Sequence, residues 1–376
     1  MPITIERRSV VWQAADDDPV GHACEPRIAR LDDGGIVLAF RTGTRRESRD
    51  GRPRLLRSED GGATWQDLGR PFDAFGAPGW DLRGAALAQL RDGALLTVIV
   101  ALDKSLDRPT YNPETEGLVP LANPIAVSRD RGATWERLPD LRGGPVPQTA
   151  SQGLLVLPDG DVLCTFETFK QYDEPGTWRY LGGSLRSSDG GRTWGECVIS
   201  AASDPDGDPH DTMWWDPRIA RLADGELVQF CYAFRHRSRT EGPVHALWSR
   251  DDGRTWTPPT PTTLHGQATY PIPLADGRLV VVQQRRSGEQ TVVAHVSEDG
   301  GRTFDPASET RLHDHAEASA GGADGSLSAF DYLMSMDGFT FGHPCGVATG
   351  PDTVLAVWYA GGPTRTAIHA AHLRIH

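Results

Sequence analysis

The stretch SEDGGATW, from Ser58 to Trp65, decides how the rest of the sequence is interpreted. Four variants follow it: SRDRGATW from Ser128, SSDGGRTW from Ser187, SRDDGRTW from Ser249 and SEDGGRTF from Ser297. Ser and Asp side chains accept backbone N–H bonds in turns, Gly tolerates positive φ, and the closing aromatic residue packs against a sheet edge. The sequence therefore predicts five equivalent turns with a structural role, which places the chemistry elsewhere.

A second phrase alternates with the first and occurs six times. It reads EPRIARLDDGGIVLAFR from Glu25, and its other copies begin at Asp81, Ala150, Asp216, Tyr270 and His343. Each copy has two short apolar runs around an Asp-Gly or Pro-Asp turn, which is a strong hairpin signal. Six copies in 376 residues give a period of about 63 residues, typical of a four-stranded blade. We therefore predict an all-β fold, a six-bladed β-propeller.

The two ends of the chain complete this arrangement. Residues 3–12 and 366–375 both have the composition of strands, and the sixth copy lacks its outer strands in chain order. Pairing the two ends in one blade closes the ring and removes exposed sheet edges, which promote aggregation. We therefore expect residues 1–376 to form a single propeller domain.

Composition limits the function. The formal net charge is −13, which disfavours binding to nucleic acid or to anionic membranes. No apolar run reaches 18 residues, and the first residues lack the apolar core of a signal peptide. Five cysteines at wide spacings indicate reduced, buried thiols and no metal site. We expect a cytoplasmic protein without cofactor; secretion after removal of a leader is the alternative.

Strand order separates a structural face from a functional one. The turns between strands one and two and between strands three and four share one face, and both are short here. The opposite face collects long polar loops, where binding residues concentrate. The first strands reach that face with Glu25, Arg27, Arg83, Asp216, Tyr270 and His343. Because a guanidinium binds both oxygens of a carboxylate, we predict a site for an anionic ligand; scaffold bridges to neighbouring carboxylates are the alternative for Arg27 and Arg83.

The five turns, together with PRIARLDDGGIVLAF and the polar loop that follows it, resemble the sialidase (neuraminidase) superfamily. In that family the turns are called Asp boxes, or BNR repeats. The resemblance covers nearly the whole chain and implies a glycoside hydrolase that removes a terminal acidic sugar, such as sialic acid, from glycans. The Asp box is specific for the fold and weakly specific for activity, because binding proteins and other hydrolases carry it.

The resemblance also implies roles for individual residues. Three arginines hold the substrate carboxylate in that family, and Arg27 matches the first of them. Asp50, in the following loop, matches the acid/base group, with Glu47 as the alternative. The candidates for the second and third arginines are Arg235 or Arg237, and Arg285 or Arg286. Since Arg285 and Arg286 are adjacent on a strand, we expect only one of them to face the axis.

The nucleophile is where the sequence departs from the family. Sialidases use a Tyr of the last blade, activated by a Glu of the fourth, and are an exception to the two-carboxylate scheme of glycosidases. Here His343 stands at the expected Tyr position, and Asp216 best matches the Glu. We expect the nucleophile to be Tyr270, or a water activated by His343 with Asp216. Two alternatives stay open: another carbohydrate-active enzyme, such as a uronate lyase with a His base, and a non-catalytic glycan-binding propeller.

Overall fold

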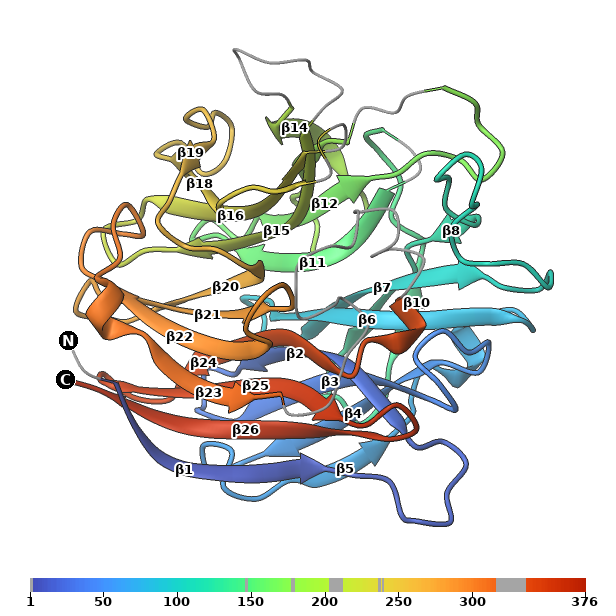
Figure 1. Cartoon of the computed structure of the whole chain (residues 1–376), viewed down its shortest axis with the longest axis horizontal. Helices are drawn as coiled ribbons and strands as arrows, with labels where there is room; N and C mark the ends of the chain where they lie inside the picture. Colours follow the sequence, from blue (N-terminus) through green and yellow to red (C-terminus); the bar gives the residue numbers. More distant parts are fainter. Residues whose placement is uncertain are drawn as a thin grey trace.

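The computed structural model describes residues 3–145, 148–176, 180–202, 212–235, 238, 240–315 and 336–376. These residues form six antiparallel sheets whose first strands surround a common axis, the six-bladed β-propeller predicted from the repeats (Figure 1). Their helical elements are three short 3-10 turns, Asp73–Phe75, Pro306–Ser308 and Met336–Gly338. Among the described residues, no helix has the length and hydrophobicity that a membrane span requires.

The first three blades follow the chain from strand β2 to strand β14. Blade one contains β2 (His22–Arg30), β3 (Ile36–Gly43), β4 (Arg52–Ser58) and β5 (Gln66–Gly69). Blade two contains β6 (Trp80–Gln89), β7 (Leu95–Asp103), β9 (Ile125–Ser128) and β10 (Glu136–Leu138), with β8 (Leu121–Ala122) beside β7. Blade three contains β11 (Gln148–Val156), β12 (Val162–Thr168), β13 (Gly182–Ser187) and β14 (Gly195–Ala201).

The next two blades repeat the pattern. Blade four contains β15 (Thr212–Arg221), β16 (Leu227–Arg235), β18 (His245–Ser249) and β19 (Thr260–Pro261), with β17 (Thr240–Glu241) beside β16. Blade five contains β20 (Gln267–Pro273), β21 (Leu279–Arg285), β22 (Thr291–Ser297) and β23 (Thr310–Asp314).

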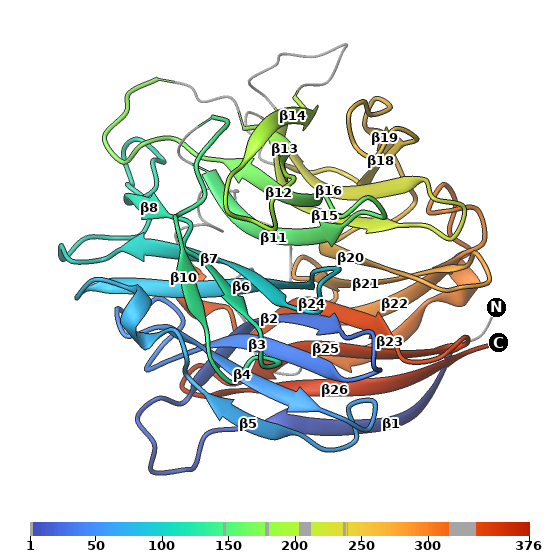
Figure 2. The same cartoon turned by 180° about the vertical axis from the view of Figure 1, so that it is seen from behind.

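Blade six closes the ring with both ends of the chain. It contains β24 (Phe341–Ala348), β25 (Thr353–Gly361), β26 (Thr366–Ile375) and, outermost, β1 (Ile3–Trp12). β1 pairs with β26 in antiparallel register, from Ile3 opposite Ile375 to Trp12 opposite Ile368. The predicted closure by the two ends is therefore confirmed, and Figures 1 and 2 show both termini at the same edge.

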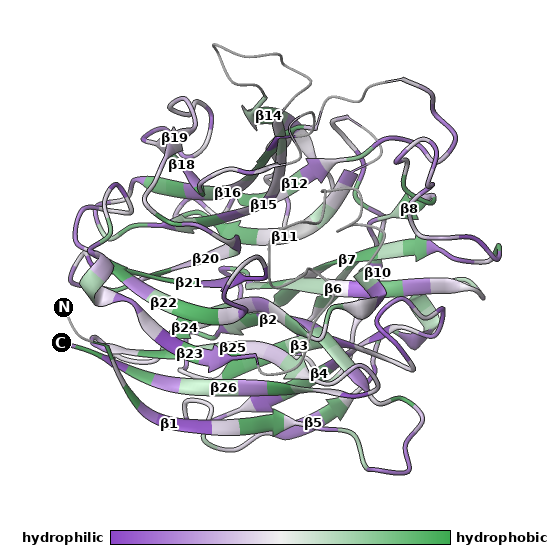
Figure 3. Ribbon diagram, in the orientation of Figure 1, coloured by the Kyte–Doolittle hydropathy of each residue, from purple (hydrophilic) through white to green (hydrophobic). Residues whose placement is uncertain are grey.

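The core lies between neighbouring sheets. Phe40 of β3, for example, belongs to one apolar cluster with Leu355 and Val357 of β25, and all three side chains are fully buried. Figure 3 shows hydrophobic stretches along strands such as β7 and β22. Each blade therefore buries one face against the blade before it and the other against the blade after it, which holds the ring rigid.

The repeated turns are built as the sequence predicts. In the first, Ser58 Oγ donates to Asp60 (2.8 Å) and accepts the Gly62 N–H (2.8 Å), while Asp60 accepts the Thr64 N–H (2.8 Å). The bonds from Thr64 lower the pKa of Asp60 to about 2. The other four turns repeat these contacts. The Ser and Asp side chains of these turns therefore bind groups of the turn itself.

Replacing Asp60 by Ala is expected to lower the free energy of unfolding by about 1–2 kcal/mol, because the three hydrogen bonds that its carboxylate accepts from Ser58 and Thr64 are lost. Urea denaturation measures the change. Glu59→Ala, in the same turn, is the control, since its carboxylate makes only ion pairs while 54% exposed, and such pairs are worth about 0–1 kcal/mol. Equal costs for the two variants would contradict a structural role for the Asp box.

Each first strand carries an irregularity halfway along its length. The strand pairing shifts between Cys24 and Arg27 in β2, between Trp215 and Arg218 in β15, and similarly in the other four blades. Such bulges re-aim side chains and recur beside active sites. Within three of them, Glu25, Asp216 and His343 have φ values of 57°, 53° and 45°, which cost a non-Gly residue about 1–3 kcal/mol. The bulges set the level at which side chains from separate blades meet.

Candidate functional site

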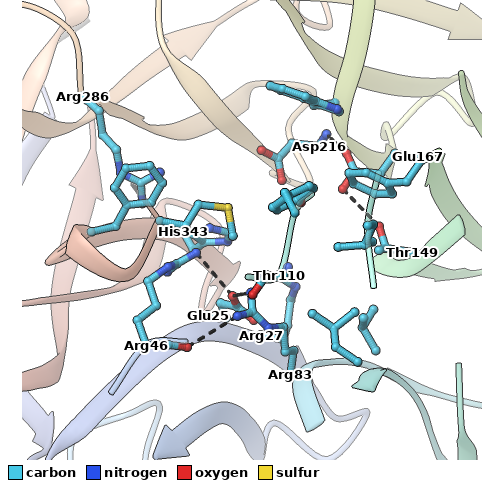
Figure 4. Close-up of a pocket in the computed structure, with 18 residues that line it drawn as sticks. Glu25, Arg27, Arg46, Arg83, Thr110, Thr149, Glu167, Asp216, Arg286 and His343 are labelled. Carbon is cyan, nitrogen blue, oxygen red and sulfur yellow. Dashed lines mark hydrogen bonds and ion pairs between the residues drawn. The ribbon is translucent and has the colours of Figure 1, made fainter. Parts of the chain in front are cut away.

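A pocket of about 130 Å³ lies on the axis at the level of the bulges. Blades one, two, three, four and six all contribute to its lining, and Arg286 extends from the end of β21 in blade five (Figure 4). Its polar lining residues are Glu25, Arg27, Arg46, Arg83, Thr110, Tyr111, Thr149, Glu167, Asp216, Arg286 and His343. The Asp-box residues are not among them, so the repeated turns serve the scaffold.

Two arginines are held together on one side of the pocket. Arg46 and Arg286 both donate to Tyr359 Oη, at 2.9 and 3.1 Å. Both guanidinium groups also pack over the Phe339 ring, 5.3 and 4.2 Å from its centre. Arg286 donates to the Phe341 carbonyl as well (2.7 Å). These contacts fix two positive charges in a desolvated position, where an anion gains most from them.

Glu25 links these arginines to the next blade. Its Oε1 lies 3.5 Å from Arg46 and 3.4 Å from Arg83, and its Oε2 accepts the Gly84 N–H (3.1 Å). Burial alone raises the pKa of Glu25, but Arg83 and Arg46 reverse the effect, and the net pKa is lowered. Glu25 therefore stays ionised and orients the arginines around it.

A buried ionic network supports Arg83 from behind. Arg41 and Asp81, both fully buried, form an ion pair of 2.8 Å. Asp81 also binds Arg83 (3.1 Å) and lies 3.4 Å from Lys104. Gly51 makes this approach possible, because a Cβ at that position would lie 1.9 Å from Asp81 Oδ1. The position of Arg83 in the pocket thus depends on charges that never reach solvent.

A pair of carboxyl groups lies opposite the arginines (Figure 4). The Asp216 N–H donates to Glu167 Oε2 (2.7 Å), and the Thr149 hydroxyl donates to Glu167 Oε1 (3.1 Å). Burial, and then the negative charge of Asp216, raise the pKa of Glu167 to about 7. Asp216 itself accepts a bond from Arg218 (3.0 Å). Glu167 is therefore buried beside a negative charge, whereas Asp216 is bound by a positive one.

His343 completes the charged lining. Burial and the positive charges of Arg46 and Arg286 lower its pKa well below the usual value, so the imidazole is neutral at pH 7. Its backbone N–H donates to Gln284, and its Nδ1 has no hydrogen-bond partner among the described residues. A neutral, half-buried imidazole can accept a proton or donate one hydrogen bond, depending on its tautomer.

One wall of the pocket is apolar. Its members come from blades two, three and four and from the segment before β24: Val100, Leu102, Leu118, Phe169, Trp215, Met336 and Phe339. Small-molecule sites typically combine an apolar wall with convergent polar groups, and this pocket has both. The described residues contain no group of three or more His, Cys, Asp or Glu side chains arranged to hold a metal.

Six predicted site residues meet in this pocket: Glu25, Arg27, Arg83, Asp216, Arg286 and His343. Burial and the nearby Arg218 lower the pKa of Arg27 to about 10, so it remains charged at neutral pH. Of the adjacent pair, Arg286 faces the pocket, whereas Arg285 points away and binds Glu309 (2.7 Å). Glu25 and Arg83 also form an ion pair with each other. They therefore line the pocket and, at the same time, form a bridge within the scaffold.

Two other predicted residues, Arg235 and Tyr270, do not line the pocket. Arg235 lies at the end of β16, and Arg237 is outside the described residues. Tyr270 packs among the core clusters on either side of blade six, and burial raises its pKa to about 12. Tyr270 is therefore outside the lining of this pocket, and its role as the nucleophile stays a prediction.

Asp50 lies in a neighbouring hollow of about 670 Å³. Its carboxylate accepts the N–H and the hydroxyl of Thr44, both at 3.1 Å, and closes the loop that follows β3. Burial acts to raise the pKa of Asp50, but bonds from Ser48 and Thr44 lower it overall. Glu47, the alternative, is bound by Arg83 and by Lys104 (2.7 Å), which lower its pKa well below the usual value. Both carboxyl groups therefore have a lowered pKa, and the assignment of either one as the proton donor stays a prediction.

Two charged residues of the pocket were not singled out from the sequence, Arg46 and Glu167. Arg46 lies in the same polar loop as Asp50, and Glu167 lies at the end of β12. Arg46 follows the second strand of its blade and Glu167 lies at the end of one, which was the available signal. The sequence did not reveal which of several polar residues in each segment turns inward, because that depends on the loop conformation.

Glu167→Gln is expected to gain stability relative to the wild type as the pH rises. The pKa of Glu167 is 4.5 in the unfolded chain and about 7 in the folded protein, so the folded state binds the extra proton between these values. The stability of the wild type therefore falls between pH 4.5 and 7, by roughly 2–3 kcal/mol from this group. Urea denaturation of both proteins at pH 5 and pH 8 measures it, and a pH-independent difference would contradict the raised pKa.

The fold and the pocket define a sialidase-like β-propeller. The family profile of the BNR repeat-like domain matches residues 110–307, just over half of the chain. The chain therefore belongs to the BNR repeat-like domain family. No curated protein sequence matches it.

Solved structures are similar over nearly the whole chain. A protein of unknown function from Dyadobacter fermentans DSM 18053 is 18% identical, with a TM-score of 0.73, covering 100% of this chain and 99% of its own. The Hadza microbial sialidase Hz136 is 17% identical, with a TM-score of 0.66, covering 97% of this chain and 68% of its own. The alpha-L-arabinanase of Penicillium chrysogenum, complexed with arabinobiose, is 15% identical, with a TM-score of 0.66 and 98% coverage of both chains. At these identities the likeness shows the fold.

Proposed function

We propose that the protein is a sialidase-like glycoside hydrolase that removes a terminal acidic sugar, sialic acid or a related one, from glycans. The charge of the pocket carries this proposal. Among the described residues, four arginines line it against three carboxyl groups, one of which is Glu167, with a pKa raised to about 7. An excess of positive charge in this pocket, in a chain of net charge −13, favours an anionic ligand.

Shape and family support a sugar as that ligand. The apolar wall, with Trp215 and Phe169, provides a surface for the less polar face of a sugar ring. Two similar structures are named as a sialidase and as an arabinanase, and both names describe cleavage of glycosidic bonds. Because fold likeness alone does not define activity, the proposal depends on the pocket.

A second candidate function, elimination by a uronate lyase, is favoured by His343. Its imidazole is neutral, half-buried and close to the arginines that would neutralise a uronate carboxylate. A neutral imidazole beside such a carboxylate can remove the adjacent proton. The two functions differ in their products, since hydrolysis releases a reducing acidic sugar and elimination releases an unsaturated sugar that absorbs ultraviolet light.

A panel of fluorogenic glycosides tests both functions. It contains sialosides and uronides, with the corresponding neutral glycosides as controls, and the products are followed by reducing-end assay and ultraviolet absorbance. Turnover restricted to acidic glycosides with a saturated product supports the hydrolase, and an unsaturated product supports the lyase. Affinity for acidic glycans without any turnover would instead indicate a binding propeller, and preference for neutral glycosides would overturn the acidic-substrate proposal.

A further inference from the structure

We propose that Glu167 and Asp216 are the acid/base pair of the reaction, with Glu167 as the proton donor to the glycosidic oxygen and Asp216 as the base that activates water. This inference rests on the proposed hydrolase function. It replaces the phenol nucleophile that the sialidase resemblance implies with two carboxyl groups, the arrangement used by most glycosidases.

The position of Glu167 is suited to holding a proton. It lies at the end of β12, lines the pocket and is 7% exposed. The Asp216 N–H and the Thr149 hydroxyl bind its two oxygens. Because a hydroxyl accepts as well as donates, the contact with Thr149 survives protonation of Glu167. The raised pKa agrees with this geometry, since it keeps the acid protonated near neutral pH.

Asp216 has the opposite environment. Its side chain is 19% exposed, so water reaches it, and Arg218 holds one oxygen at 3.0 Å. The bulge of β15 gives it a positive φ of 53° and directs it to the pocket, while its own N–H binds Glu167. One acid is buried between two donors and the other is open to water and held by an arginine, and neighbouring acids in such different surroundings can take different roles.

The phenols of the described residues offer weaker alternatives. Tyr270 and Tyr359 do not line the pocket, and Tyr359 is fully buried with its hydroxyl bound by Arg46 and Arg286. Tyr111 does line the pocket, but burial and the charge of Glu167 raise its pKa. A phenol that resists ionisation is a poor nucleophile without a dedicated base.

The proposed step is balanced. Glu167 transfers its proton to the glycosidic oxygen as the bond from that oxygen to the anomeric carbon breaks, and the electron pair leaves with the alcohol. Water attacks the anomeric carbon and gives its proton to Asp216. The products are the free acidic sugar and the alcohol, and the pair then exchanges protons with solvent to restore its starting state.

Two substitutions test the assignment on the acidic glycoside found in the panel. Glu167→Gln is expected to lower kcat about 10³-fold for a sugar leaving group and less than about 10-fold for dinitrophenolate, which departs without protonation. Asp216→Asn is expected to lose activity about 10³-fold, with partial recovery in azide and formation of a glycosyl azide. Glu196→Gln is the matched control, because Glu196 lies in the same blade, 43% exposed, and pairs with Arg186.

The pH profile gives an independent readout. In the wild type, kcat/KM is expected to fall as the pH rises through about 7, the pKa of Glu167, and this limb is expected to disappear in Glu167→Gln. The other groups that act electrostatically with Glu167 are Asp216, Arg218, Tyr111 and Cys231. Tyr111→Phe is therefore included as a test of the alternative nucleophile, and under this assignment the fall of kcat/KM near pH 7 is expected to remain in that variant.

The outcomes distinguish a failure of the proposed hydrolase function from a failure of the assignment of Glu167 and Asp216. A wild type that cleaves no glycoside overturns the proposed function and this assignment with it. A wild type that does cleave one, with Glu167→Gln or Asp216→Asn remaining within about 10-fold for the sugar leaving group, overturns the assignment alone. Loss of activity in Tyr111→Phe with an active Glu167→Gln points to a phenol nucleophile and also overturns it.

Discussion

Arg286→Ala is expected to lower kcat/KM for an acidic glycoside by about 100- to 1,000-fold, the largest effect among single substitutions outside the carboxyl pair. A charge-assisted hydrogen bond contributes about 1.5–3 kcal/mol, and a guanidinium binds a carboxylate through two of them. Arg286 is 2% exposed, and Phe341, Tyr359 and Phe339 fix its orientation before any ligand binds. No orientation cost therefore offsets the gain.

The neighbouring arginine provides the control. Arg285 precedes Arg286 directly but binds Glu309 away from the pocket, so Arg285→Ala is expected to change kcat/KM by less than about 3-fold. Steady-state kinetics on both variants measure the difference, with circular dichroism and the melting temperature as checks on folding. Equal losses in the two variants, or none in either, would contradict a role for Arg286 in binding the anion.

Asp81→Ala is expected to lower the free energy of unfolding by about 3–5 kcal/mol, the largest effect on stability. Asp81 is fully buried and contacts Arg41, Arg83 and Lys104. Its removal leaves Arg41 without a carboxylate partner, because the other contacts of Arg41 are to neutral oxygens of Arg45 and Ser48. Arg83 and Lys104 lose one carboxylate but keep Glu47. Breaking a buried pair costs far more than the pair itself contributes, since the remaining charge cannot reach water.

Urea denaturation compares this variant with Asp67→Ala in the same blade. Asp67 binds Arg54 at 2.7 Å, but the two side chains are 39% and 26% exposed, and water replaces the lost partner. The expected cost is therefore below about 1 kcal/mol. Asp81→Asn preserves the shape of the side chain and is expected to lie between the two. A cost below 1 kcal/mol for Asp81→Ala would show that the buried network does not support blade one.

The arrangement of blades follows from short-range sequence signals. Asp-Gly turns, the five Asp boxes and the alternation of two phrases are local features, and each acts through the conformation of a few consecutive residues. The closure of the ring needed one further step, the pairing of residues 3–12 with 366–375, and the absence of any other partner for these strands predicted it. Adjacent residues of a strand face opposite sides of the sheet, which is also a property of consecutive residues. This rule predicted that only one of Arg285 and Arg286 faces the axis.

The candidate site could be predicted only in part. Glu25, Arg83, Asp216 and His343 lie on or beside the bulges of first strands, so the repeat itself marked them. The polar segments after second strands lack such a repeat. Asp50 and Arg46 lie four residues apart in one of these segments, yet Arg46 enters the pocket whereas Asp50 closes the loop against Thr44.

The sequence by itself determined the propeller, its closure and the face that carries the site, because local turns and periodic strands specify them. Only the tertiary structure decided which acids and arginines share a pocket and in which state of protonation. The pKa of Glu167 depends on Asp216, 49 residues away, and on burial by three blades. Electrostatic energies depend on distances in space and on exclusion of water, and neither quantity is encoded in a stretch of neighbouring residues.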